Sequence, residues 1–167
     1  MEITLETPRL LLRRMRGSDL DAWARMTADA EVMKYIGTGV TFNRSEAWRS
    51  IAGVLGHWQL LGYGMWAVAR KEDDELVARV GFFDPPGWPG FELGWIVGRE
   101  HWGKGYATEA ARVALDYAFT ALKRDRVVSL IRDGNERSVR VAEKIGERYS
   151  GEVELLGSMA RVYEITR

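Results

Sequence analysis

The sequence predicts one mixed α/β or α+β domain, covering residues 1–167, in which a sheet packs against helices. The length is about what one globular domain occupies, and 46% hydrophobic residues can fill a sizeable core. Short strand-like runs alternate with longer segments of helical periodicity. The sequence shows no internal repeat, low-complexity tract or linker, so a single domain is expected.

The first third of the chain predicts a strand and two helices. Asn43 and Glu46 stand three residues apart in the pattern of a capping box, in which each side chain binds the backbone N–H of the other. Ser18 is followed three residues later by an acid, in the same pattern. The expected elements are a strand over 9–15, a helix over 18–28 and a helix over 43–62.

The remainder of the chain predicts three successive antiparallel strands and a second group of strands and helices. A charged turn separates the first two strands, and a loop rich in Pro and Gly precedes the third. The expected strands are 65–69, 76–83, 91–97, 127–131 and 161–165, and the expected helices are 105–122 and 136–145.

Composition excludes several classes of function. Lys plus Arg and Asp plus Glu both number 24, so the chain lacks the basic excess of a non-specific nucleic-acid binder. It has no cysteine, which excludes disulfides and a covalent cysteine intermediate. No metal site is expected, because the two histidines, His57 and His101, are not at ligand spacing. No apolar run predicts a membrane span or a signal peptide, so we expect a cytoplasmic protein.

A glycine-bearing turn, Gly103-Lys104-Gly105, joins a predicted strand to a predicted helix. Free N–H groups and the dipole at a helix start bind anions, and glycine lets a phosphate approach the backbone. A turn that merely needs unusual dihedral angles is the alternative interpretation. A P-loop does not fit, because Lys104 lies between the glycines and Tyr106 follows them. A dinucleotide fingerprint fits poorly, because Thr108 stands where a third small residue is needed.

Four motifs in order, spread over nearly the whole chain, resemble the GNAT acetyltransferases and, within them, the ribosomal-protein N-terminal acetyltransferases. The motifs are Thr7-Pro8-Arg9-Leu10-Leu11-Leu12-Arg13, Phe91-Glu92-Leu93-Gly94-Trp95-Ile96-Val97, Trp102-Gly103-Lys104-Gly105-Tyr106-Ala107-Thr108-Glu109-Ala110, and Asn135-Glu136-Arg137-Ser138 followed by Glu143-Lys144-Ile145-Gly146. The chain departs from the family at Glu100, where Gln or Arg is usual, and at Glu147, where an aromatic residue is usual. Arg99 or Lys104 could supply the charge that Glu100 lacks.

The resemblance implies a splayed, mostly antiparallel mixed sheet with helices on both faces and acetyl-CoA as co-substrate. The pantetheine arm would pair with a strand, and an N–H near Ile96 would stabilise the oxyanion. The residues implied in acetyl-CoA binding are Ile96, Val97, Gly98, Trp102, Gly103, Lys104, Gly105, Tyr106, Ala107, Thr108 and Asn135.

Two residues are candidates for catalysis. Glu92 is an acid in an otherwise apolar strand and could deprotonate the attacking amine, although a structural role is the alternative. The resemblance implies Ser138 as the acid that protonates the leaving thiolate, although Ser138 also fits an ordinary position in the first turn of a helix. Among the tryptophans, Trp88 in the Pro/Gly-rich loop could line the entrance for the acceptor. The patterns place Trp48, Trp58, Trp66 and Trp95 in the core.

The predicted activity is direct acetyl transfer from acetyl-CoA to a primary amine in a ternary complex. A non-catalytic coenzyme A binding or regulatory module is the alternative, and so is a structural domain with an incidental turn. The sequence does not choose among a protein N-terminus, a polyamine, an aminoglycoside-like amine and a small metabolite as acceptor. Exposed strand edges could support a homodimer.

Overall fold

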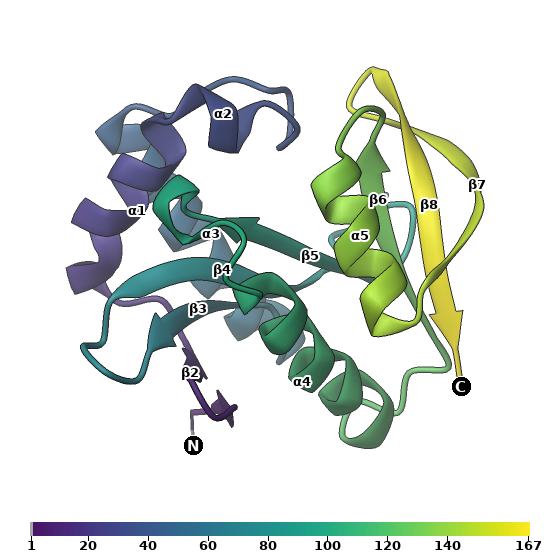
Figure 1. The fold of residues 1–167 in the computed structure, drawn as a ribbon, viewed down its shortest axis with the longest axis horizontal. Helices are drawn as coiled ribbons and strands as arrows, with labels where there is room; N and C mark the ends of the chain where they lie inside the picture. Colours follow the sequence, from purple (N-terminus) through teal and green to yellow (C-terminus); the bar gives the residue numbers. More distant parts are fainter. Residues whose placement is uncertain (1) are drawn as a thin grey trace.

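The fold is built on one twisted sheet, seen in a computed structural model that describes residues 2–167 (Figure 1). Within these residues the sheet has eight strands in the order β1-β2-β3-β4-β5-β6-β8-β7. The strands are β1 Leu5–Glu6, β2 Leu10–Arg13, β3 Met65–Arg70, β4 Leu76–Phe83, β5 Glu92–Val97, β6 Arg126–Arg132, β7 Arg148–Leu155 and β8 Ser158–Thr166. Neighbouring strands are antiparallel except β5 and β6, which are parallel.

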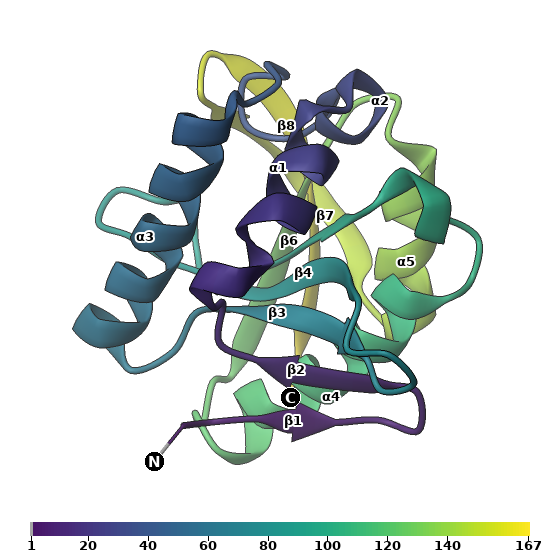
Figure 2. The same ribbon diagram turned by 90° about the vertical axis from the view of Figure 1, so that its left-hand side faces the viewer.

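Helices cover both faces of the sheet, as the side view in Figure 2 shows. The α-helices are α1 Leu20–Ala28, α2 Ala30–Met33, α3 Arg44–Leu61, α4 Tyr106–Thr120 and α5 Glu136–Ile145. In this view α3 lies on one side of the sheet, and α4 and α5 lie on the other. Short 3-10 turns at Gly17–Asp19 and Arg99–His101 precede α1 and the glycine turn. The predicted mixed sheet with helices on both faces is therefore confirmed.

The sheet splits between its two parallel strands. β5 and β6 share one paired position, Glu92 with Val128, and then diverge towards the top of Figure 1. Beyond that point the β6-facing edge of β5 is no longer covered by strand pairing. A strand edge with free N–H and C=O groups can bind an extended chain as an added strand.

One of the two expected helix caps is present. The side chain of Asn43 accepts a hydrogen bond from Glu46 N–H at 2.9 Å, and the Glu46 carboxylate accepts one from Asn43 N–H at 2.8 Å. The expected cap at Ser18 is wrong, because α1 begins at Leu20 with Asp19 at the N-cap position. The Asp19 carboxylate binds the Arg13 guanidinium at 2.8 and 2.9 Å, which fixes the start of α1 to β2.

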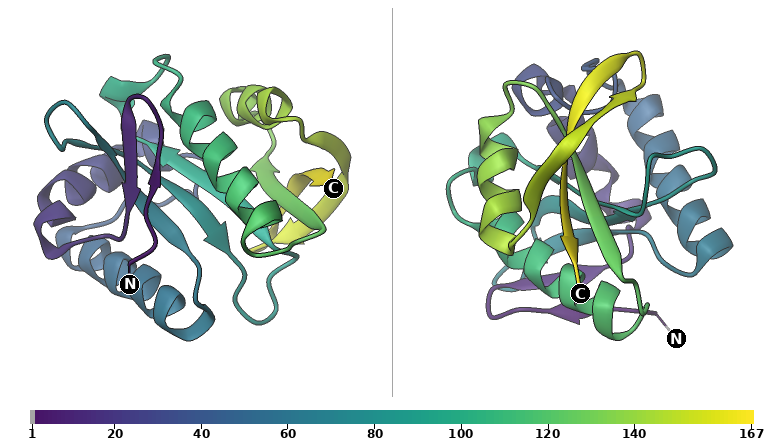
Figure 3. Two further views of the ribbon diagram at one scale, coloured as in Figure 1. Left: turned by 90° about the horizontal axis from the view of Figure 1, so that it is seen from below. Right: turned by 90° about the vertical axis from the view of Figure 1, so that its right-hand side faces the viewer.

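The sequence patterns missed β1, α2 and β7. β1 has two residues and α2 has four, too few for a periodic pattern to be recognised. β7 lies at the outer edge of the sheet, and Figure 3 shows it twisting across β8. Five of its eight side chains are exposed, and its alternation of polar and apolar residues is confined to Glu152-Val153-Glu154-Leu155, which the sequence analysis did not recognise as a strand.

The main core lies where α1, α3 and α4 pack on the strands, and it contains the predicted core residues Trp58 and Trp66. Their rings meet edge to face with centroids 5.0 Å apart. Trp48 was also expected in the core, but 58% of its surface is exposed because it lies on the outer side of α3. Across residues 2–167, no helix combines the length and the apolar composition that crossing a membrane requires.

Candidate active site

The glycine turn before α4 presents free N–H groups at a helix start. Gly103 and Gly105 have positive φ angles of 76° and 80°, a region that glycine adopts readily. Glu109 N–H is the first in α4 to reach the carbonyl of the preceding turn, donating to Gly105 O at 3.0 Å. The N–H groups of the three residues before it, Tyr106–Thr108, therefore have no helical acceptor. Together with the helix dipole they form an anion site.

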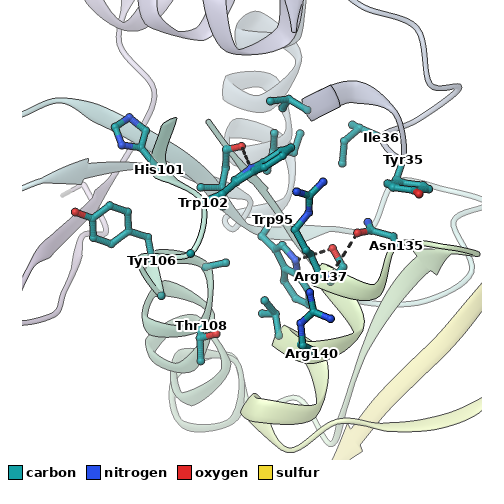
Figure 4. A pocket seen from close by; sticks show the side chains of 18 of the residues that line it. Tyr35, Ile36, Trp95, His101, Trp102, Tyr106, Thr108, Asn135, Arg137 and Arg140 are labelled. Carbon is teal, nitrogen blue, oxygen red and sulfur yellow. Dashed lines mark hydrogen bonds between the residues drawn. The ribbon is translucent and has the colours of Figure 1, made fainter. Parts of the chain in front are cut away.

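Arg9, from the turn between β1 and β2, holds this loop in place. Its Nη2 donates to Lys104 O at 2.9 Å, and its Nε donates to the Glu109 carboxylate at 2.7 Å. Its guanidinium lies 4.8 Å from the centre of the Tyr106 ring. Because that ring points away from α5 in Figure 4, Tyr106 faces the anion site with its backbone and supports Arg9 with its side chain.

A cavity of about 310 Å³ lies between this loop and α5 (Figure 4). Basic residues of α5 line it at helical spacing, namely Arg137, Arg140 and Lys144. The Arg137 guanidinium stacks over the Trp102 ring at 3.5 Å. The sequence analysis missed this basic face, although a spacing of three and then four residues could have indicated it. Glu100, where the family usually has a Gln or Arg, has a side chain that is 70% exposed.

The unpaired edge of β5 presents the N–H groups of Trp95 and Val97 rather than that of Ile96. Gly98 N–H donates to Val77 O at 3.0 Å, so Gly98 faces β4. Alternate residues of a strand direct their backbone groups to the same side, and Ile96 is paired with Arg79 in the same register. Of the N–H groups near Ile96, those of Trp95 and Val97 are therefore the ones available to an oxyanion. Val97 O already accepts from Trp102 Nε1 at 2.9 Å.

A second cavity of about 810 Å³ opens on the α3 side of β4 and β5. Most of its wall is apolar, with aromatic side chains such as Phe42, Phe83 and Trp88. The two cavities meet at the split between β5 and β6. The residues that line both are Tyr35, Ile36, Trp95, Ile96, Asn135 and Ser138.

Glu92 faces the second cavity from the first residue of β5. Burial raises the pKa of its carboxyl to about 7, while hydrogen bonds from Trp88 and the Leu130 backbone lower it. Trp88 Nε1 donates to Glu92 Oε2 at 2.7 Å. Trp88 therefore lines the cavity, as expected of the acceptor's entrance, and also orients the carboxylate.

His57 lines the same cavity, but both ring nitrogens are used. Nδ1 lies 2.8 Å from the carbonyl of Tyr63, and a carbonyl can only accept, so Nδ1 carries the hydrogen. Nε2 accepts from Asp84 N–H at 3.2 Å, so it carries none. His57 is therefore neutral and has no free nitrogen with which to take a proton from an amine. Among the groups that line this cavity, Glu92 is the one carboxylate.

Asn135 and Ser138 lie at the junction of the cavities. Asn135 Oδ1 accepts from Ser138 N–H at 3.3 Å, so the alternative role as a helix cap is present. That bond leaves the amide nitrogen of Asn135 available for another partner. Trp95 Nε1 donates to Ser138 Oγ at 3.1 Å, which leaves the serine hydrogen free to be donated (Figure 4). Trp95 was expected in the core, but it is half-buried and lines both cavities.

Glu147 is a second buried carboxyl, and its hydrogen bonds require a neutral acid. Ser129 Oγ lies 2.7 Å from Leu93 O and 3.0 Å from Glu147 Oε1. A hydroxyl has one hydrogen, and the Leu93 carbonyl can only accept, so the Ser129 hydroxyl donates to Leu93. Glu147 must then donate the proton of the other hydrogen bond. Burial raises the pKa of Glu147 to about 8, the Ser129 bond lowers it and the charge of Glu92 raises it further. This chain of three residues ties β5 to β6 just where they separate.

Glu147→Gln should therefore change how stability depends on pH. Unfolded Glu147 ionises above its ordinary pKa of 4.5, whereas the folded group keeps its proton up to about 8. Between these values the native state binds more protons, so the wild type loses stability as pH rises. The variant should gain stability relative to the wild type across that window, by up to about 4–5 kcal/mol at its upper end, since one pKa unit corresponds to about 1.4 kcal/mol. Urea unfolding at several pH values measures this difference, and a difference independent of pH would show that Glu147 is ionised in the folded protein.

These features define a class of protein. A helix start with free N–H groups that can bind an anion, a strand edge open to an extended arm and a second cavity reaching the same edge suit an acyltransferase that uses coenzyme A.

Comparison with known proteins identifies the family. The family model described as the acetyltransferase (GNAT) domain matches residues 9–148. The uncharacterized N-acetyltransferase YnaD of Bacillus subtilis is 33% identical over 151 residues, covering 90% of this chain and 85% of that protein. The crystal structure of an acetyltransferase from Agrobacterium tumefaciens is 30% identical, with a TM-score of 0.88 over 99% of this chain and 95% of that one. This chain belongs to the GNAT acetyltransferase family.

The fold extends to the branch that the sequence motifs indicate. RimJ of Mycobacterium smegmatis, solved in complex with CoA-disulfide, has a TM-score of 0.76 and 24% identity over 99% of this chain and 86% of that one. At this identity the similarity concerns the fold. The family and its N-acetyltransferase relatives establish this chain as an acyltransferase that uses acetyl-CoA.

Proposed function

We propose that this enzyme binds acetyl-CoA in the first cavity and an amine in the second, and passes the acetyl group directly between them. The observation that carries the proposal is the meeting of the two cavities at Trp95, Ile96, Asn135 and Ser138. Donor and acceptor can thus approach from opposite faces of the sheet. Holding two reactants together removes much of the entropic cost of a bimolecular step.

The donor half of the site would hold the coenzyme by its charges and its backbone. The N–H groups of Tyr106, Ala107 and Thr108 would bind the pyrophosphate, with Gly103 and Gly105 allowing its close approach. Arg137, Arg140 and Lys144 would face the remaining phosphate charge. The free edge of β5 would pair with the pantetheine arm, and the Asn135 amide would contact it.

The acceptor half would supply the proton transfers. Glu92 would take a proton from the ammonium of the acceptor, and the neutral amine would attack the thioester carbonyl. The N–H groups of Trp95 and Val97 face the split and would stabilise the oxyanion. When the carbon–sulfur bond breaks, Ser138 would give its proton to the departing thiolate, regaining one from solvent. A non-catalytic module has no need of this arrangement, so it remains the weaker alternative.

Direct transfer predicts a ternary complex. Initial rates of thiol release, varied against acetyl-CoA and an amine, should give intersecting double-reciprocal lines. No cysteine is present to carry the acetyl group, so mass spectrometry of enzyme incubated with acetyl-CoA alone should detect no acetylated catalytic residue. Parallel lines with a trapped acetyl-enzyme would overturn direct transfer, and failure to bind acetyl-CoA would overturn the whole proposal.

A further inference from the structure

The second cavity contains a half-buried cation, Arg79, that the acetyl transfer described above does not use. Arg79 and Glu92 lie on neighbouring strands, paired with Ile96 and Phe83 respectively. Alternate residues of a strand face the same side of the sheet, so Arg79 and Glu92 both reach this cavity, and both line it. Four residues separate the two pairs, which is about 13 Å along the strands at roughly 3.3 Å per residue.

Two glycines form the strand floor between these two charged residues, and the side chain of Met65 lies over it. Gly81 of β4 is paired there with Gly94 of β5. The nearest atom to a Cβ added at Gly94 would be the methyl carbon of Met65, at 3.2 Å. The Arg79 guanidinium lies against Trp23 and Ser50 of α1 and α3, so a ligand over Met65 could reach it from an amine held between Glu92 and Trp95.

The Arg79 guanidinium is fixed in place but has no counterion. It lies 4.4 Å from the centre of the Trp23 ring, and its Nη1 donates to Ser50 Oγ at 3.1 Å. Its Nε is buried without a hydrogen-bond partner, and within residues 2–167 no carboxylate lies within 4.0 Å of it. Burial lowers the pKa of Arg79 to about 10, so it stays charged at neutral pH. A cation held without a partner among apolar walls is costly unless a ligand supplies the anion.

The other ionisable groups leave the cavity with a positive surplus. Arg132 also lines it and donates to Gly37 O at 3.0 Å, again with no carboxylate within 4.0 Å among the described residues. His57 is neutral, as its two hydrogen bonds require. Glu92 contributes at most one negative charge against two positive ones. This balance disfavours acceptors with several ammonium groups, such as polyamines and aminoglycosides, because like charges repel.

The wall between the charged ends is apolar. It includes side chains from four separate parts of the chain, and these are Phe42, Val54, Leu60, Phe83, Trp88 and Leu155. Apolar walls of this kind gain free energy by covering apolar surface on a ligand.

We infer that the acceptor is an amphoteric amine, with its amine between Glu92 and the split at Trp95, an apolar body over Met65 and an anionic group, such as a carboxylate, at the Arg79 guanidinium. This inference rests on the proposed function, because it identifies the second cavity as the acceptor site. It makes Arg79 a residue that determines specificity rather than one that takes part in the chemistry.

The test measures how affinity and kcat/KM depend on the chain length of the acceptor. The probes are ω-aminoalkanoates of increasing chain length, each matched with the n-alkylamine of the same length, and spermidine. Affinity for the protein saturated with coenzyme A is measured by calorimetry, and kcat/KM by thiol release. At the best length the aminoalkanoate should bind and react about tenfold better than its alkylamine, since a charge-assisted hydrogen bond contributes that much. Spermidine should be the poorest acceptor.

Arg79→Met keeps much of the side-chain volume and removes the charge, so it should abolish the tenfold preference for the aminoalkanoate. Arg79→Lys should retain part of it, which separates loss of the charge from loss of packing on Trp23. Arg132→Met is the matched control and should keep the preference. Equal affinity for the two series in the wild type, or a preference lost in Arg132→Met and kept in Arg79→Met, would overturn the assignment. If all the amines are acetylated equally well, the assignment of Arg79 is wrong but the proposed function stands. If the protein does not bind coenzyme A, the proposed function itself is wrong.

Discussion

Glu92→Gln should lower kcat for acetyl transfer by roughly a hundredfold to ten-thousandfold, while the dissociation constant for acetyl-CoA hardly changes. Glutamine keeps the shape of the side chain and can still accept the Trp88 hydrogen bond, which measures 2.7 Å in the wild type. It cannot take a proton from an ammonium. The loss should therefore appear in the chemical step and not in the donor cavity, which Glu92 does not line.

The pH profile of this variant gives a second measurement. Burial raises the pKa of Glu92 to about 7, and the active form of a base is the deprotonated one. The wild-type rate should therefore increase as pH rises through neutrality. The variant should approach the wild type at high pH, where the free amine is already neutral and needs no base.

Glu147→Gln is the matched control, because it replaces the other buried carboxyl near the split of the sheet. Glu147 bonds to Ser129 and is absent from the walls of both cavities. Its replacement should leave kcat close to that of the wild type. If Glu92→Gln matches the wild type near neutral pH, Glu92 is not the base, and water or another group carries the proton.

Periodicity predicted the sheet and its long helices because those elements bury one continuous face. The face of α4 repeats small apolar residues at Ala110, Ala114 and Ala118, all fully buried, and the pattern specifies a helix against a sheet. The edge strand β7 buries little, and its alternation covers only Glu152–Leu155. Motif order also indicated the turn before α4, and its two glycines adopt positive φ, while its role in binding phosphate stays a prediction.

The finer geometry of the site depends on contacts that no local pattern records. Which N–H groups of β5 face the split depends on the register with β4, so the sequence indicated the neighbourhood of Ile96 but not that Trp95 and Val97 present the free N–H groups. In the sequence, Arg79 looks like an ordinary polar residue of a strand, and nothing near it in the chain indicates that its charge lies in a cavity. Its importance follows from Trp23 and Ser50, which lie on helices far away in the chain.

Gly105→Val should weaken acetyl-CoA binding by about a hundredfold, the loss expected when two charge-assisted hydrogen bonds cannot form. Gly105 is the N-cap of α4, with a φ of 80°, and the N–H groups that follow it point to where the pyrophosphate would lie. A branched side chain would crowd that approach. The atom nearest to an added Cβ is Nη2 of Arg9, at 3.5 Å, an ordinary van der Waals contact, so the Cβ itself fits beside the residue that holds the loop. Calorimetry with acetyl-CoA measures the affinity.

Gly62→Val is the control that separates crowding of the phosphate from backbone strain. Gly62 ends α3 with a φ of 77°, almost the same angle, and a Cβ there would meet nothing within 4 Å. In both variants a branched residue at positive φ introduces similar backbone strain, on the order of 1–3 kcal/mol, so their melting temperatures should fall by similar amounts. Only Gly105→Val should lose affinity, with its circular dichroism unchanged. If both variants bind acetyl-CoA as the wild type does, the pyrophosphate does not lie on this turn, and the free N–H groups at the start of α4 need another ligand.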